Sequence, residues 1–165
     1  MATLKRDIRT TARPGDVWDA IRDVGALHTR LVPGFVADTR LEAGARIVTF
    51  SNGTVVRETI VTMDDHDRRL VWSASGASLA HHNGSVQVFT APDGATRVVW
   101  IADFLPDAAG DAIGAMMDHG MTVMKQTLDR LAETADDFDR DDRRSASVKP
   151  DRSESASRQP DPPLD

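Results

Sequence analysis

The chain has 165 residues, a net charge of −6 and a sequence pI of about 5.3. This favours one acidic domain and disfavours nucleic acid as a partner, because Lys and Arg side chains that neutralise phosphates dominate such binding. The sequence contains no Cys and no Tyr, which excludes disulfides, thiolate metal ligands, thiol nucleophiles and phenolic acid–base groups. No segment approaches the roughly 20 apolar residues that cross a bilayer, and the N-terminus lacks the apolar core of a signal peptide, so we expect a cytoplasmic protein.

The N-terminal part of the chain predicts one strand and two short helices. Residues 2–10 alternate loosely between apolar and polar side chains, as a half-buried strand does. A short helix is expected after Pro14-Gly15, with Asp16 as its N-cap. A second short helical piece is expected at residues 26–31.

Six further strands are predicted up to residue 104. Two tripeptides have the composition of hairpin turns, Ser51-Asn52-Gly53 and Pro92-Asp93-Gly94. Strands that are linked by hairpins form an antiparallel sheet. The strands are expected at residues 35–41, 46–51, 55–63, 69–75, 85–90 and 96–104.

One long helix is predicted at about residues 107–135, directly after the last strand. Its large apolar side chains recur at helical spacing, namely Ile113, Met116, Met117, Met124, Leu128 and Leu131. Antiparallel strands followed by one such helix predict an α+β helix-grip fold, a curved antiparallel sheet wrapped around a long C-terminal helix. Such a layout leaves room for a cavity between helix and sheet.

The composition changes after Ala135. The only large apolar residues beyond it are Phe138, Val148 and Leu164, among Asp, Arg, Ser, Pro and Gln. Such a segment buries too little apolar surface to offset the entropy lost on ordering. We therefore expect a domain at residues 1–135 and a disordered acidic and polar tail at residues 136–165. The alternative is an interaction tail that folds on a partner.

Several stretches of the domain resemble a known family. They are PGDVWDAIRDVGALHTRLVPG, GARIVTF, VVRETIVTMDDHDRRLVW, GSVQVF and PDGATRVVWIADFLP. Over about residues 3–135 the chain resembles the polyketide cyclase/dehydrase group of the START-like (SRPBCC) superfamily. The resemblance implies a START/birch-pollen-allergen-like helix-grip fold with a deep hydrophobic cavity. Members bind lipids, hormones or polyketides, and some catalyse ring cyclisation or dehydration, but the family has no single catalytic residue set to transfer.

Arg46 and Glu58 are the candidate catalytic residues. A type I turn at Ser51-Asn52 with Gly53 as a bulge places Arg46 opposite Glu58, on the same face of the sheet as Phe50. A two-residue type I′ turn would instead separate the pair onto opposite faces. In the functional interpretation the pair orients a ligand carbonyl or hydroxyl, with Glu58 as an acid or base. The alternative is a structural ion pair near the sheet edge.

Large side chains of the sheet and the helix are the candidate ligand-binding residues. Trp72 and Trp100 are expected in the cavity wall, and their indole N–H groups need a partner when buried, either a ligand oxygen or a backbone carbonyl. The methionines of the predicted long helix are also candidates, because Met is frequent at adaptable binding surfaces. The alternative is that they only pack in the core. The predicted ligand-binding residues are Phe50, Trp72, His82, Trp100, Met117, Gly120 and Met124.

The histidines do not predict a metal site. His28, His81 and His82 lack the spacing of metal-ligating pairs, and no Cys assists them. We expect no metal and no cofactor. One of these histidines near the cavity mouth suits acid–base chemistry better, whereas His119 lies off the apolar stripe of the helix and is expected to be solvated.

Three functional hypotheses follow. The first is binding or transport of an apolar or aromatic small molecule, polyketide- or lipid-like, in a cavity between sheet and helix. The second is a polyketide cyclase or dehydratase in which Arg46, Glu58 and a His handle protons. The third is a protein-interaction module. The expected partner is a small hydrophobic ligand rather than nucleic acid.

Overall fold

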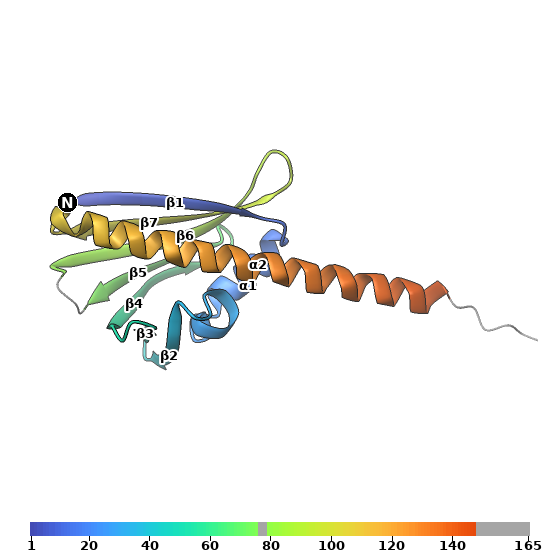
Figure 1. The fold of residues 1–165 in the computed structure, drawn as a ribbon, viewed down its shortest axis with the longest axis horizontal. Helices are drawn as coiled ribbons and strands as arrows, with labels where there is room; N and C mark the ends of the chain where they lie inside the picture. The colour runs from blue at the N-terminus through green and yellow to red at the C-terminus, as the bar shows by residue number, and fades with distance from the viewer. Residues whose placement is uncertain (76–78, 148–165) are drawn as a thin grey trace, which may run out of the picture.

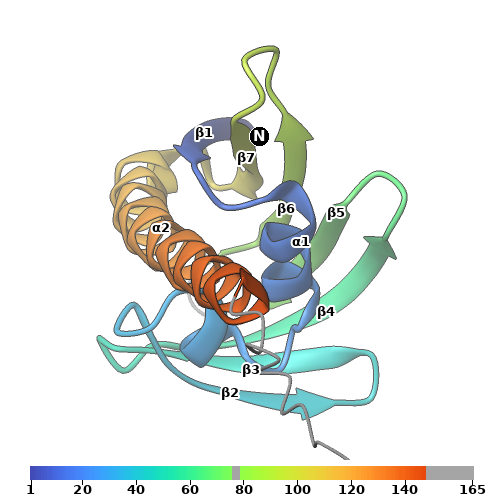
Figure 2. The same ribbon diagram turned by 90° about the vertical axis from the view of Figure 1, so that its right-hand side faces the viewer.

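The computed structural model describes residues 1–75 and 79–147. Seven antiparallel strands form one sheet in the order β1-β7-β6-β5-β4-β3-β2. Figure 2 shows this sheet curling around the long helix α2, with α1 lying beside β6. The predicted α+β helix-grip fold is confirmed. The strands are β1 (Ala2–Thr10), β2 (Val36–Glu42), β3 (Ala45–Phe50), β4 (Val55–Asp64), β5 (Arg69–Ser75), β6 (His81–Thr90) and β7 (Thr96–Leu105).

Four helical segments accompany the sheet, and three of them are short. None of the helices in the described part of the chain is long and apolar enough to cross a membrane. The first helix begins at Pro14, where a proline fits the first turn, so Asp16 lies inside the helix and pairs with Arg13 instead of capping it. The segments are α1 (Pro14–Arg22), the π-helix η1 (Leu27–Leu31), the 3-10 helix η2 (Asp107–Ala109) and α2 (Gly110–Ser147).

The hairpin between β3 and β4 has the predicted register. Gly53 adopts a φ of 87°, and the Phe50 amide donates to the Thr54 carbonyl at 2.8 Å. A positive φ is strained for residues with a Cβ, so Gly53 determines the turn and with it the pairing of the strands. Arg46 therefore lies directly opposite Glu58. The prediction of a facing pair is confirmed.

Helix α2 is held against the edge strand β1 by polar contacts along its length. Asp118 forms an ion pair with Arg6, and Asp129 accepts a hydrogen bond from the Thr10 hydroxyl at 2.7 Å. Its apolar face packs into the core with the inner face of the sheet. The helix lies beside β1 and crosses the open side of the curved sheet (Figures 1 and 2). It therefore does not pack directly on the central strands. This placement leaves a cavity between them.

The C-terminal boundary differs from the prediction. Helix α2, predicted to end at about Ala135, continues to Ser147 and includes residues 136–147 of the predicted tail. Extending a formed helix adds one hydrogen bond per residue and needs no new nucleus, and Asp137 pairs with Arg140 one turn along. Residues 136–140 are exposed and project beyond the domain (Figure 1). Residues 148–165 of the predicted tail lie outside the described residues.

Candidate functional site

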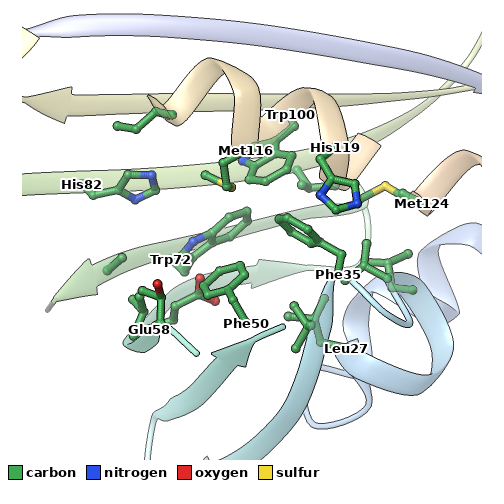
Figure 3. Close-up of a pocket in the computed structure, with 18 of the residues that line it drawn as sticks. Leu27, Phe35, Phe50, Glu58, Trp72, His82, Trp100, Met116, His119 and Met124 are labelled. Atoms are coloured by element: carbon green, nitrogen blue, oxygen red, sulfur yellow. The ribbon is translucent and has the colours of Figure 1, made fainter. Parts of the chain in front are cut away.

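A cavity of about 500 Å³ lies between the inner face of the sheet, η1 and the first half of α2. Its wall is mostly apolar and includes side chains from β3 to β7. Figure 3 shows two different ends. We call the end at His82 and Glu58 the polar end, together with Arg46, and the end at Leu27, Phe35 and Met124 the apolar end.

The polar end contains a buried ion pair. Arg46 Nε donates to Glu58 Oε2 at 2.7 Å, and the two side chains are only 4% and 9% exposed. The Arg46 guanidinium also lies 5.6 Å from the centroid of the Trp72 ring, within the range of a cation–π contact. Both charged residues line the cavity. The pair therefore forms part of the cavity wall, and its positive and negative charges neutralise one another.

His82 belongs to the same end. The prediction that it precedes a strand starting at Ser85 is wrong, because β6 starts at His81 and pairs with the end of β7. Its side chain lines the cavity and the residue is 6% exposed. Burial lowers the pKa of His82 below its ordinary value of 6.5, and the Glu58 carboxylate partly opposes that shift. The imidazole is therefore neutral at pH 7, and its Nδ1 has no hydrogen-bond partner among the described residues.

Trp72 and Trp100 both line the cavity, where the family resemblance led us to expect them. Their ring centroids are 6.3 Å apart. Trp72 lies on the backbone of Gly84, its partner across the β5–β6 ladder, where a Cβ would come within 2.5 Å of the indole ring. Both indole nitrogens are buried without a hydrogen-bond partner in the described part of the chain. No backbone carbonyl of the described residues accepts a hydrogen bond from either indole N–H, which was the alternative to a ligand oxygen.

The glycine and methionine predictions for α2 need correction. Met117 is fully buried in the core and does not line the cavity, whereas its neighbour Met116 and the predicted Met124 do. Gly120 is not part of the wall either. Its missing Cβ lets Phe35 and Trp100 pack onto the helix, since a Cβ there would lie 3.0 Å from each ring. On α2 the cavity therefore contacts Met116, His119 and Met124 but not Met117.

Aromatic rings surround the cavity near the predicted residue Phe50. Phe35 contacts Phe50 edge to face at 5.3 Å and His119 at 5.1 Å between centroids. His119 is exposed, as expected, but it also lines the cavity, which the sequence analysis missed (Figure 3). The signal was present: Ile113, Met116 and His119 follow one another at i, i+3 spacing and share one face of the helix.

A metal centre has no support in the described residues. No three His, Asp or Glu side chains within residues 1–75 and 79–147 are grouped so that they could hold an ion. The buried carboxylate of Glu58 is already bound to Arg46. The arrangement suits recognition of an organic molecule by apolar contact and a few hydrogen bonds.

Solved structures with the same fold come from several sources. XoxI from Bacillus cereus has a TM-score of 0.70 at 18% identity, covering 78% of this chain and 96% of that one. The di-domain ARO/CYC BexL from the BE-7585A biosynthetic pathway has a TM-score of 0.68 at 13% identity, covering 78% of this chain and 46% of BexL. Norcoclaurine synthase from Thalictrum flavum, in complex with dopamine and hydroxybenzaldehyde, has a TM-score of 0.64 at 13% identity, covering 81% and 87%. At these identities the likenesses show the fold alone.

The sequence itself places the chain in a family. No curated protein matches it significantly. Residues 1–136, which span all seven strands and the part of α2 that packs on them, match the family described as polyketide cyclase / dehydrase and lipid transport. With its helix-grip fold and its cavity, this chain belongs to the polyketide cyclase/dehydrase and lipid transport family.

Proposed function

We propose that the chain binds an apolar or aromatic small molecule, polyketide- or lipid-like, in the cavity between the sheet and α2. The observation that carries the proposal is a mostly apolar cavity of about 500 Å³ in a domain of this size. Ligand pockets commonly measure about 300–1,000 Å³ and combine apolar walls with a few placed polar groups. Burial of each 100 Å² of apolar ligand surface contributes roughly 2.5 kcal/mol.

The proposal is tested by titration with Nile red and a panel of aromatic and alkyl compounds, followed by tryptophan fluorescence. Two of the three tryptophans line the cavity, so a bound ligand is expected to quench their emission. Ala112→Phe places a ring in the cavity wall and is expected to weaken binding. Ala115→Phe on the same helix is the control, because Ala115 is exposed like Ala112 but does not line the cavity. Equal affinities for both variants and the unaltered chain would contradict the proposal.

A second candidate function is acid–base catalysis on the bound molecule, of the cyclase or dehydratase type. The observation that favours it is His82, a neutral buried imidazole that lines the cavity with one ring nitrogen unpartnered. A neutral imidazole accepts a proton at neutral pH, and the Glu58 carboxylate, which Arg46 holds in place, would favour the imidazolium that forms. Glu58 thus acts through His82, and Arg46 holds Glu58.

The catalytic candidate is tested with tetralone, a ketone whose C–H bonds next to the carbonyl exchange with solvent when a base removes the proton. The rate of deuterium uptake from heavy water is followed by NMR. The chain is expected to accelerate exchange, and His82→Gln is expected to abolish the acceleration while tetralone still binds. Exchange no faster than in buffer, with binding intact, would leave the binding function alone.

A further inference from the structure

We infer that the indole N–H groups of Trp72 and Trp100 are the specificity-determining donors of the cavity, and that its ligand is a neutral molecule with at least two acceptor oxygens at one end. The inference rests on the proposed binding function. It narrows the ligand class from any apolar molecule to an oxygenated, uncharged one. It also fixes the orientation, with the oxygens at the polar end and the hydrocarbon part at the apolar end.

The two indole nitrogens carry the first step. An indole N–H donates and never accepts, and buried Trp N–H groups usually find a partner. Trp18 illustrates the usual case, because its Nε1 donates to Asp65 Oδ1 at 2.9 Å. Trp72 and Trp100 have no such acceptor among the described residues although both nitrogens are buried. Two donors in one cavity wall thus have no acceptor among the described residues.

The position of these donors gives the orientation. In Figure 3 the nitrogen atoms of both indoles lie on the side of their rings that faces His82. His82 Nδ1 is a further unpartnered polar atom at that end. The opposite end presents the apolar side chains of Leu27, Phe35 and Met124, with the exposed His119 imidazole beside Phe35 as its polar group. A ligand with its oxygens on one side can therefore accept hydrogen bonds at the polar end while its hydrocarbon part contacts the apolar end.

The charge balance of the wall disfavours an anionic ligand. Arg46 is the only Lys or Arg that lines the cavity in the described part of the chain, and Glu58 already neutralises it. A carboxylate near the indoles would therefore be buried beside Glu58 without a cation of its own, which is costly. Fatty-acid anions are disfavoured for this reason. Carbonyl, phenol and ether oxygens accept hydrogen bonds without that cost.

The test compares three ligands with one ring system: naphthalene, its para-quinone and naphthoate. The quinone carries two acceptor oxygens on one ring, and the chain has no Cys for it to alkylate. Two net hydrogen bonds of about 0.7 kcal/mol each correspond to roughly a tenfold gain in affinity. The quinone is thus expected to bind about tenfold more tightly than naphthalene or naphthoate, by isothermal titration.

Indole N–H resonances give a readout without substitution. The chain has three tryptophans, and the quinone is expected to move the Nε1–H signals of Trp72 and Trp100 downfield while that of Trp18 stays in place. Naphthalene is expected to move none of them downfield. Assignment comes from the three Trp→Phe variants. Quinone binding that leaves the Trp72 and Trp100 signals unshifted would overturn the inference.

The same variants test specificity. Trp72→Phe and Trp100→Phe keep an aromatic wall but remove the donor, so each is expected to weaken the quinone about threefold and to leave naphthalene nearly unchanged. Trp18→Phe, outside the cavity wall, is the control. Equal losses for both ligands would make the two tryptophans apolar walls only. Equal affinity of naphthalene and quinone overturns the inference but leaves the proposed function standing, whereas no binding of any of the three overturns both.

Discussion

The two ends of the cavity differ in the interactions that their side chains still lack. At the apolar end, Leu27, Phe35 and Met124 need only van der Waals contact, which any hydrocarbon of suitable shape can supply, and the one imidazole there, His119, is exposed. At the polar end, Arg46 and Glu58 satisfy one another, but the two indoles and His82 keep polar atoms without a partner. We therefore expect the apolar end to set how tightly a molecule binds and the polar end to set which molecule binds.

The largest expected effect comes from breaking the ion pair at the polar end. Glu58→Gln leaves the Arg46 guanidinium buried and uncompensated, and we expect a loss of about 3–5 kcal/mol in the free energy of unfolding. Urea denaturation measures it. Replacing both residues by apolar ones, Arg46→Met with Glu58→Leu, is the control and should recover most of the loss. A loss below about 1 kcal/mol for Glu58→Gln would mean that the pair is solvated and not part of a closed wall.

Gly84→Ala tests whether the Trp72 ring must lie on the β6 backbone. The added Cβ would come within 2.5 Å of the indole, so the ring has to move, and overpacking of this kind costs about 1–3 kcal/mol. The displaced ring should also weaken binding at the polar end. Gly15→Ala is the matched control, because nothing lies within 4 Å of the Cβ it adds. Equal thermal midpoints for the two variants would contradict this packing.

The register of the polar end could be predicted from the sequence, but its chemistry could not. Gly53 requires a turn with positive φ, and that single requirement aligns Arg46 with Glu58. Whether an indole N–H meets a carbonyl depends on rotamers and on the approach of distant strands, which the sequence does not encode locally. Trp18 and Trp72 look alike in the sequence, yet only Trp18 has a partner.

The helix shows a similar limit. Spacing predicts an apolar stripe, but a rotation of one residue, about 100° of helix, decides whether Met116 or Met117 faces the cavity. That rotation is set by the contacts of α2 with β1, which join residues more than 100 positions apart. The predicted end of the helix at Ala135 failed for a different reason. Composition measures the surface available for burial, whereas a helix that is already anchored can continue into solvent.

A smaller effect is expected from pH. The folded-state pKa of His82 lies below its ordinary value of 6.5 because burial disfavours the charged imidazole. The unfolded state therefore binds more protons, so His82 contributes stability above about pH 6.5 that is lost as the pH falls through the folded pKa. His82→Gln should flatten the fall in unfolding free energy between about pH 7 and pH 5. A fall as steep as that of the unaltered chain would contradict the burial of His82.

The smallest effect is expected from removing the end of α2 and the residues after it. Residues 136–140 are exposed and make no part of either end of the cavity. A chain that ends at Ala135 should therefore keep its thermal midpoint and its affinity for Nile red. Differential scanning calorimetry and the dye titration measure both. A drop of several degrees would show that the C-terminal residues pack on the domain.

Native mass spectrometry of the protein isolated from its own host tests the central claim most directly. The account predicts a retained molecule whose accurate mass corresponds to a neutral compound with at least two oxygens, released when the chain unfolds. Trp72→Phe with Trp100→Phe should retain less of it than the unaltered chain does. A retained fatty acid or an oxygen-free hydrocarbon, held equally by both proteins, would contradict the account.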